Sequence, residues 1–187
     1  MANAIIETDL AVLHEQIGAK LSEAFPAFQV VEFYREEDER APLKEAQLPA
    51  LLLEMSELEP DLESDPGTEQ LPAIARFEAR IVVGFRTAQA KVEVRKLAGA
   101  VAAFMHKNKR FYGKGGPVTV DAIVADDFYP ELDRFEVWRV DFSIQCWLGE
   151  TVWTSDGTTP LQPVYSWVPN IGIGNDDKYE DSVTNGI

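Results

Sequence analysis

The stretch Phe135–Leu148, FEVWRVDFSIQCWL, decides the fold class, because its side chains alternate between two chemical kinds along its length. The first set is apolar and consists of Trp138, Val140, Phe142, Ile144, Cys146 and Leu148. The second set is mostly polar and consists of Arg139, Asp141, Ser143, Gln145 and Trp147. Successive side chains of a strand point to opposite faces of a sheet. The stretch is therefore predicted to be a strand with one buried face, on which Cys146 is a structural residue.

Four earlier segments also have the features of strands. Ala27–Arg35 is rich in β-branched and aromatic residues. Pro49–Ser56 is apolar on both faces at Leu51–Leu53, which indicates a central strand. Pro72–Phe85 alternates like the final strand, with Phe85 on its buried face, and Val118–Phe128 precedes a turn. Together with Phe135–Leu148, these segments predict a sheet of about five strands.

Two segments have the apolar spacing of amphipathic helices. Thr8–Ala24 places apolar residues three and four apart, with Thr8 as the expected N-cap and Pro26 as the stop. Thr87–Lys107 is the second helix, and one flank of it, including Gly99 and Ala103, is unusually small and uncharged. We interpret that flank as a surface that packs against a second surface. The order α-β-β-β-α-β-β predicts an α+β fold, a mostly antiparallel sheet covered by two helices.

The pattern fades after Gly149, and the chain is predicted to have two parts. Residues 1–150 form the α+β domain, and residues 151–187 form an extended C-terminal arm with a flexible end. Trp153 and Trp167 are the expected aromatic anchors of this arm.

The composition is that of a globular protein, with 45% hydrophobic residues in 187 and a net charge of −15. Met1–Asp9 lacks the features of a signal peptide, and no apolar run is long enough to predict a membrane span. A single cysteine cannot form an internal disulfide, which fits a reducing compartment. The acidic balance argues against a protein that wraps nucleic acid.

The charge is unevenly distributed along the chain. Residues 36–69 carry twelve acids and two bases, and they cover most of two predicted acidic loops at Glu36–Leu48 and Glu57–Leu71. Residues 91–114 carry seven bases and one acid. Such patches can be solvated surfaces that keep a protein in solution, or surfaces that meet on neighbouring subunits or partners.

Signatures of catalysis or metal binding are weak. The acidic loop beginning at Asp61 has proline where an EF-hand needs its glycine and its final glutamate. The adjacent Asp126 and Asp127 point to opposite faces of a strand, and the glycines of Gly113–Gly116 lack the spacing of a nucleotide-binding loop. His14 is expected to be a packing residue. We predict a protein that is not an enzyme and has no catalytic residues, metal site or cofactor.

The basic run His106–Arg110, followed by Phe111 and Tyr112, allows three interpretations. It can complement the dipole at a helix C-terminus, dock a protein, or contact nucleic acid. The net charge and the shortness of the run count against nucleic acid.

Four stretches together resemble the tail terminator proteins of long-tailed bacteriophages and prophages. They are FPAFQVVEFY (Phe25–Tyr34) after the first helix, LPALLLEMSE (Leu48–Glu57), RFEARIVVGF (Arg76–Phe85) running into VEVRKLAGAVAAFM (Val92–Met105), and FEVWRVDFSIQCWLGE (Phe135–Glu150). The resemblance covers roughly Ile5–Glu150, and the arm lies outside it.

The resemblance implies a virion assembly protein that closes into a hexameric ring at the head-proximal end of the tail tube and is assembled in the host cytoplasm. Such a ring stops tube polymerisation and receives the head. Its expected partners are the tail tube protein and head–tail connector proteins, and DNA passes through it without specific binding. The alternatives are a head–tail connector or tail-completion protein and, from another class, a small cation- or ligand-binding domain or enzyme.

Site residues follow from the charge pattern and the predicted elements. The expected subunit or partner interface consists of Lys91, Arg95, Lys96, Lys107, Lys109, Arg110, Arg139, Asp141, Trp153 and Trp167. The acidic residues expected to face the channel are Glu36, Glu37, Asp38, Glu39, Asp61, Glu63 and Asp65.

Overall fold

A computed structural model describes most of the chain. The described residues are 7–34, 43–65, 67–111, 113–126, 135–152, 164–165, 174–175 and 180–181. The chain divides into two units, Met1–Trp153 and Thr154–Ile187. In the second unit, β6 (Val164–Tyr165) pairs with β7 (Glu180–Asp181) in antiparallel orientation.

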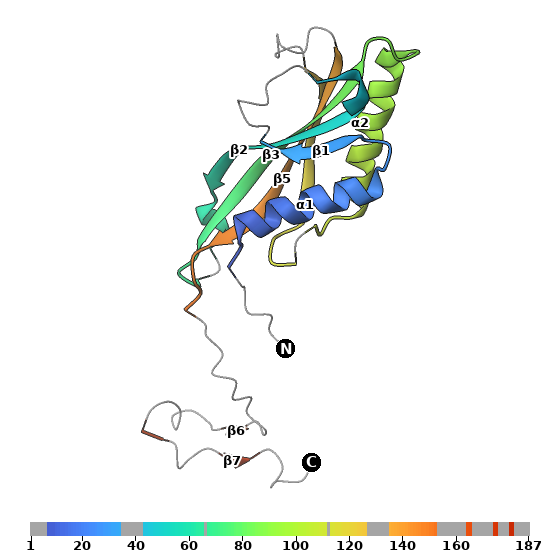
Figure 1. The fold of residues 1–187 in the computed structure, drawn as a ribbon. Coiled ribbons are helices and arrows are strands. Elements are labelled where there is room, and N and C mark those ends of the chain that lie inside the picture. Colours follow the sequence, from blue (N-terminus) through green and yellow to red (C-terminus); the bar gives the residue numbers. More distant parts are fainter. Residues whose placement is uncertain are drawn as a thin grey trace. The chain divides into compact units, whose positions relative to one another are not determined.

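The first unit is built on a five-stranded sheet (Figure 1). Its strands are β1 (Val30–Phe33), β2 (Ala50–Pro60), β3 (Leu71–Gly84), β4 (Val118–Ala125) and β5 (Phe135–Leu148). They lie in the order β1-β2-β3-β5-β4, and all neighbours are antiparallel except β1 and β2, which are parallel. The predicted α+β class is confirmed, and β5 has the bounds that its alternation predicts.

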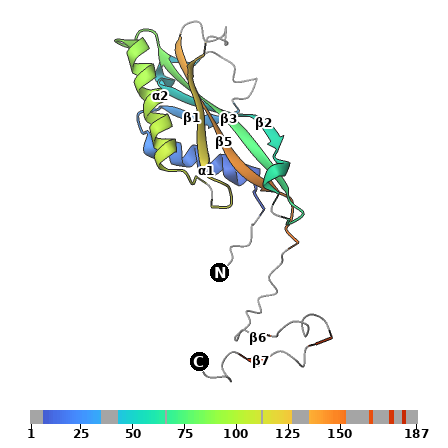
Figure 2. The same cartoon turned by 180° about the vertical axis from the view of Figure 1, so that it is seen from behind.

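Both helices, α1 (Leu10–Ala24) and α2 (Ala90–Lys107), pack against the same side of the sheet, as the views in Figures 1 and 2 show. Leu13 of α1 and Val94 of α2 join one core with the inward residues of β2, β3 and β5. At its centre the rings of Phe77 and Phe142 stack with centroids 5.1 Å apart. Cys146 is buried in this core, as predicted from its place in the alternation.

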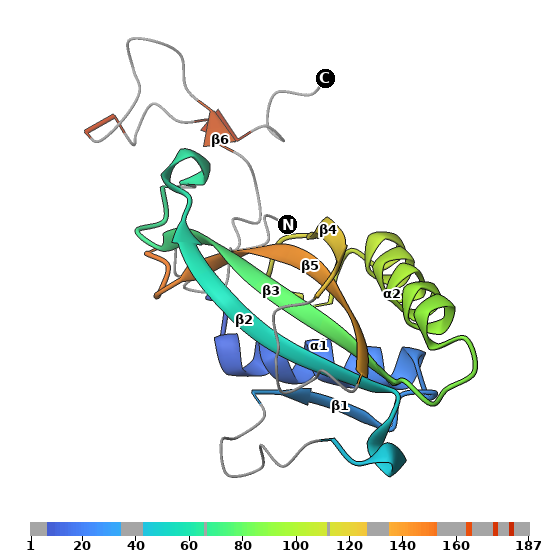
Figure 3. The same ribbon diagram turned by 90° about the horizontal axis from the view of Figure 1, so that it is seen from above.

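The opposite side of the sheet has no α-helix in the described part of the chain, as the view from above makes visible (Figure 3). A smaller apolar cluster lies on it at one end, where the segment before β2 contributes Leu43 and Leu48 against Val82 and Val137. This segment includes a short 3-10 helix, η2 (Glu45–Gln47), in a region predicted as loop. Between this cluster and Ile74 and Trp147 toward the other end, this side carries charged residues of β2, β3 and β5.

The N-terminal cap of α1 differs from the prediction. Asp9, not Thr8, is the N-cap, because its carboxylate accepts hydrogen bonds from the backbone N–H groups of Ala11 and Val12. Thr8 instead joins the end of β5: its N–H donates to the carbonyl of Trp147 at 2.8 Å, and its hydroxyl accepts from the Trp147 N–H at 3.1 Å. A buried threonine thus extends the sheet rather than starting the helix.

Other boundaries also differ from the predictions: β1 begins at Val30 rather than Ala27, and β4 ends at Ala125 rather than Phe128. The second helix begins at Ala90 rather than Thr87, because Gln89 has a left-handed backbone with φ of 56°. Phe85 lies beyond the end of β3 and is 59% exposed, so its predicted burial is wrong. β2 continues to Pro60 through a bulge between Met55 and Glu57, so the second acidic loop is shorter than predicted.

Candidate functional site

Three arginines form a row of ion pairs on the side of the sheet opposite the helices. Arg76 and Arg80 project from β3, and Arg139 projects from β5. Their positions alternate with those of the buried core residues, so their side chains lie on the opposite face of the sheet. Their carboxylate partners come from β2, β3, β5 and the residue after β4. We call this surface the arginine face.

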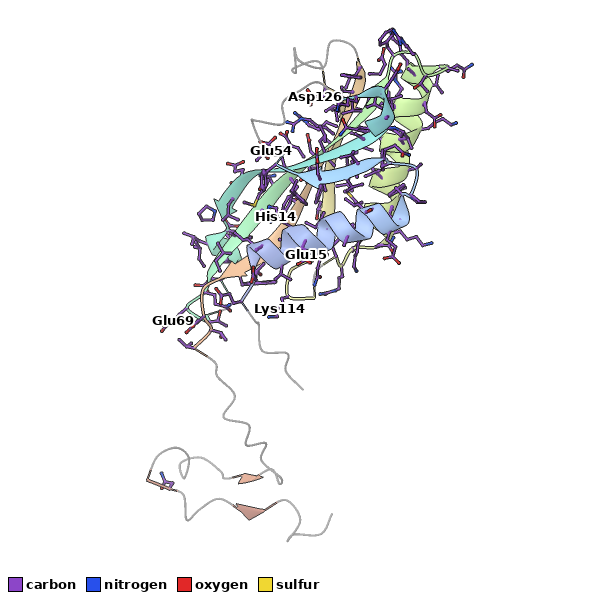
Figure 4. The ribbon with its side chains drawn as sticks, viewed as in Figure 1. His14, Glu15, Glu54, Glu69, Lys114 and Asp126 are labelled. Carbon is purple, nitrogen blue, oxygen red and sulfur yellow. The ribbon has the colours of Figure 1, made fainter. Side chains whose placement is uncertain are left out.

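Arg80 is the centre of the arginine face. It pairs with Glu54 at 2.8 Å, with Asp126 at 3.0 Å and with its strand neighbour Glu78. The Arg80 side chain is 11% exposed and that of Asp126 only 2%. Figure 4 shows Glu54 and Asp126 in the same part of the sheet. Buried charges of this kind need partners to offset the cost of removing them from water.

Arg139 and Asp141, two predicted interface residues, pair with each other on the arginine face. The Arg139 Nε atom lies 2.7 Å from the Asp141 carboxylate, and a second Arg139 nitrogen lies 3.6 Å from Glu78. Both side chains are partly buried. These two residues are therefore parts of a fixed network rather than free side chains on an exposed face.

At the other end of the row, Arg76 pairs with Glu59 at 2.8 Å and with Glu57 at 3.6 Å. Sequence reasoning placed both glutamates in a loop and missed them as surface residues of a strand. The alternation Glu57-Leu58-Glu59 was the available signal, but the bulge before Glu57 shifts its phase relative to the first half of β2.

The arginine face carries a surplus of negative charge. Its six carboxylates belong to Glu54, Glu57, Glu59, Glu78, Asp126 and Asp141, and they face the three arginines. All three glutamates on β2 remain partly exposed to solvent. The surface is therefore structurally rigid and still attractive to a cationic partner.

A second surface lies on α2, on the side that points away from the sheet. Its exposed residues Val92, Lys96, Gly99, Ala100, Ala103 and Lys107 are three and four apart, so they share one helix face. We call this surface the α2 stripe. Val92 is 51% exposed. The middle of the stripe is uncharged, and a lysine stands toward each end.

The remaining predicted basic residues surround the ends of α2. Lys91 and Arg95 are exposed near its start, where the Arg95 guanidinium lies 5.1 Å above the ring of Trp138. Lys109 and Arg110 are exposed after its end. Because a helix rises about 1.5 Å per residue, Lys91 and Lys107 are about 24 Å apart. The basic run thus forms two separate groups instead of one patch.

The predicted acidic residues have different outcomes. Asp61 flanks the 3-10 helix η3 (Leu62–Ser64), which contains Glu63, and Asp65 caps a turn by accepting from the N–H of Gly67 at 2.8 Å. Glu36–Glu39, Trp153 and Trp167 lie outside the described residues. Within the described residues, no group of three or more His, Cys, Asp or Glu side chains is arranged to hold a metal ion.

A groove of about 420 Å³ opens at the start of α2. It is lined mainly by the apolar side chains of Leu48, Pro49, Val83 and Leu97. At its rim Arg86 pairs with Glu45 at 3.3 Å, and both residues are well exposed. The groove contains none of the predicted site residues.

The chain matches no protein-family model and no curated protein sequence. None of the helices among the described residues is long and apolar enough to cross a membrane. A functional assignment therefore depends on the residues and surfaces of the chain itself.

Proposed function

We propose that this chain is a tail terminator of a long-tailed bacteriophage or prophage. In this function it is a structural subunit of a ring, expected to be hexameric, at the head-proximal end of the tail tube. The ring ends tube polymerisation and provides the docking surface for head–tail connector proteins. The protein then acts by occupying a surface and catalyses no reaction.

The observation that carries this proposal is the presence, among the described residues, of two different charged surfaces on one subunit, each with exposed side chains. The arginine face carries a surplus of carboxylates, and the α2 stripe carries Lys96, which pairs with Glu93 of its own helix at 3.4 Å, and Lys107. Rings form through heterologous contacts, in which one surface of a subunit meets a different surface of its neighbour. Complementary charge on the two surfaces steers such contacts and sets their register.

The resemblance to the terminator family gives independent support. Its four stretches supply β1, β2, β3 with α2, and β5, which together form most of the sheet and of its core. The resemblance is thus carried by the elements that determine the fold, and no part of it depends on the C-terminal arm.

DNA must cross such a ring without adhering to it. Acidic residues at the channel would repel the phosphates, and we keep Glu36, Glu37, Asp38 and Glu39 together with Asp61, Glu63 and Asp65 as the proposed channel-facing set. The arm, with Trp153 and Trp167, is proposed to reach a neighbouring subunit or the tube.

The direct test is tube assembly with the tail tube protein encoded in the same genome. We expect purified chain, added during polymerisation, to shorten the tubes and to bind at one end of each in electron micrographs. Charge reversal at Lys107, Lys109 and Arg110 should reduce capping while the thermal unfolding midpoint stays unchanged. Tubes of unaltered length with no bound chain would contradict the proposal, and binding only to head–tail connector proteins would favour a connector instead.

A further inference from the structure

We propose that the arginine face is the docking site for α2 of a second copy of this chain, so that each subunit covers the open side of its neighbour's sheet. The inference deepens the proposed function and rests on it for the existence of a ring. It assigns both partner surfaces: the α2 stripe on one subunit and the arginine face on the next.

The sheet itself gives the first reason. A sheet is stabilised when other elements pack against its faces. In many proteins that contain both helices and strands, helices cover both faces of the sheet. Here α1 and α2 cover one side, while among the described residues the other side is covered toward its ends, by the cluster around Leu43 and Leu48 at one end and by Asp61, which accepts a hydrogen bond from Gln145, at the other. The arginine face occupies the area that remains.

The α2 stripe gives the second reason. Gly99 lies in the middle of an 18-residue helix, where glycine weakens the helix relative to alanine. A Cβ atom added at Gly99 would meet no atom within 4 Å, so the subunit's own packing does not require a glycine there. Together with Ala100 and Ala103, it lets another backbone approach α2 closely.

Charge and spacing give the third reason. Lys96 and Lys107 are eleven residues apart on α2, or about 17 Å at 1.5 Å per residue. Because of the bulge, Glu54 and Glu59 on β2 lie opposite Glu78 and Ile74, which are only four residues apart on β3, or about 14 Å at about 3.4 Å per residue, a difference from the lysine spacing that flexible lysine side chains can span. A helix lying along β2 can therefore place one lysine near each acidic end of the arginine face while its uncharged middle crosses the sheet.

The contact is heterologous, because the α2 stripe and the arginine face lie on opposite sides of the same sheet. Each subunit offers both surfaces, so the contact propagates from copy to copy and closes into a ring when the rotation between subunits allows it. This geometry needs no contribution from the C-terminal arm.

The first experiment fills the α2 stripe. Gly99→Leu should leave the thermal unfolding midpoint unchanged or raised, and should weaken self-association in sedimentation velocity by at least about tenfold, equivalent to about 1.4 kcal/mol. The matched control is Ala19→Leu, which adds a side chain at an exposed position of α1. Equal association of the two variants would overturn the proposal, as would a wild-type chain that stays monomeric at every concentration.

The second experiment swaps charges between the two surfaces. A variant with Lys96→Glu and Lys107→Glu has two acidic surfaces, and a variant with Glu57→Lys and Glu59→Lys has two basic ones. Each alone should lose association, and an equimolar mixture should recover it, because the acidic stripe of one meets the basic face of the other. A neutral variant, Glu57→Gln with Glu59→Gln, separates loss of the contact from loss of the fold.

These outcomes are distinguishable from failure of the proposed function. If the charge-swap variants and the Gly99→Leu variant form rings as the wild-type chain does, and these rings cap tubes, this interface is overturned and the terminator function stands. A mixture that restores association but never caps a tube would support the interface and contradict the terminator function.

Discussion

The imidazole of His14 and the phenol of Tyr34 form a hydrogen bond that connects α1 to the end of β1, with His14 Nε2 and the Tyr34 oxygen 2.8 Å apart. The other ring nitrogen of His14 lies 2.5 Å from the carbonyl of Leu10 and must donate to it. Nε2 of the neutral ring therefore accepts the Tyr34 hydroxyl hydrogen. The same oxygen accepts from the N–H of Met55 at 3.2 Å, which ties both elements to β2.

Tyr34→Phe should lower the free energy of unfolding by about 1–2 kcal/mol, because it leaves the Met55 N–H and the His14 ring without their shared partner. Denaturant titration measures the loss. In a double-mutant cycle with His14→Ala, the two substitutions should be non-additive by about 0.5 kcal/mol or more. Strict additivity would show that the bond contributes no coupling.

Arg80→Met should destabilise the fold by about 3–5 kcal/mol, because it leaves the buried Asp126 carboxylate without its arginine. Arg76→Met is the matched control on the same strand. Arg76 is 40% exposed and its glutamate partners are also exposed, so its loss should cost less than about 1 kcal/mol. Chemical denaturation of both variants gives the comparison, and equal losses would mean that burial does not decide the strength of these pairs.

The thiol of Cys146 should be unreactive in the native chain. Burial raises its pKa from 9.0 to about 11, and the thiolate is the reactive form. At pH 8 a disulfide reagent should label the folded chain about a hundredfold more slowly than the chain in denaturant. Because this is the only cysteine, the signal has a single source. Fast labelling under native conditions would contradict the buried position.

The same shift predicts a contribution to stability that depends on pH. Between pH 9 and 11 the unfolded chain loses the thiol proton while the folded chain keeps it, so the free energy of unfolding falls as pH rises. The slope is about 1.4 kcal/mol per pH unit in that range. Cys146→Ala should lack this part of the decline, and parallel curves for the two proteins would refute the assignment.

Asp9→Ala and Thr8→Val separate a helix cap from a sheet anchor. Loss of the Asp9 cap should cost about 1 kcal/mol, because the first N–H groups of α1 lose their acceptor. Thr8→Val removes the hydroxyl that accepts from Trp147 and donates to the Lys114 carbonyl at 3.1 Å, at a cost of about 1–3 kcal/mol. Hydrogen exchange should show faster exchange at the Trp147 amide only in the Thr8 variant.

Local patterns predicted much of the fold. The alternation in Phe135–Leu148 and the apolar spacing around Leu13 and Val94 identified β5 and both helices, because each depends on the geometry of a single element. The position of the helix N-cap was harder to predict, because two neighbouring residues could each fill it. Thr8 and Asp9 are both good caps, and only the position of β5 beside Thr8 decides which one caps the helix.

The candidate site shows the same division. The sequence alone determined that the protein is strongly acidic, that its charges are segregated, and that α2 has a small uncharged flank. Only the tertiary structure decided that Glu57 and Glu59 join Arg76 and Arg80 on one open side of the sheet. The physical reason is that strand order, a bulge and cross-strand ion pairs bring together residues far apart in the chain, and no local period records which strands become neighbours.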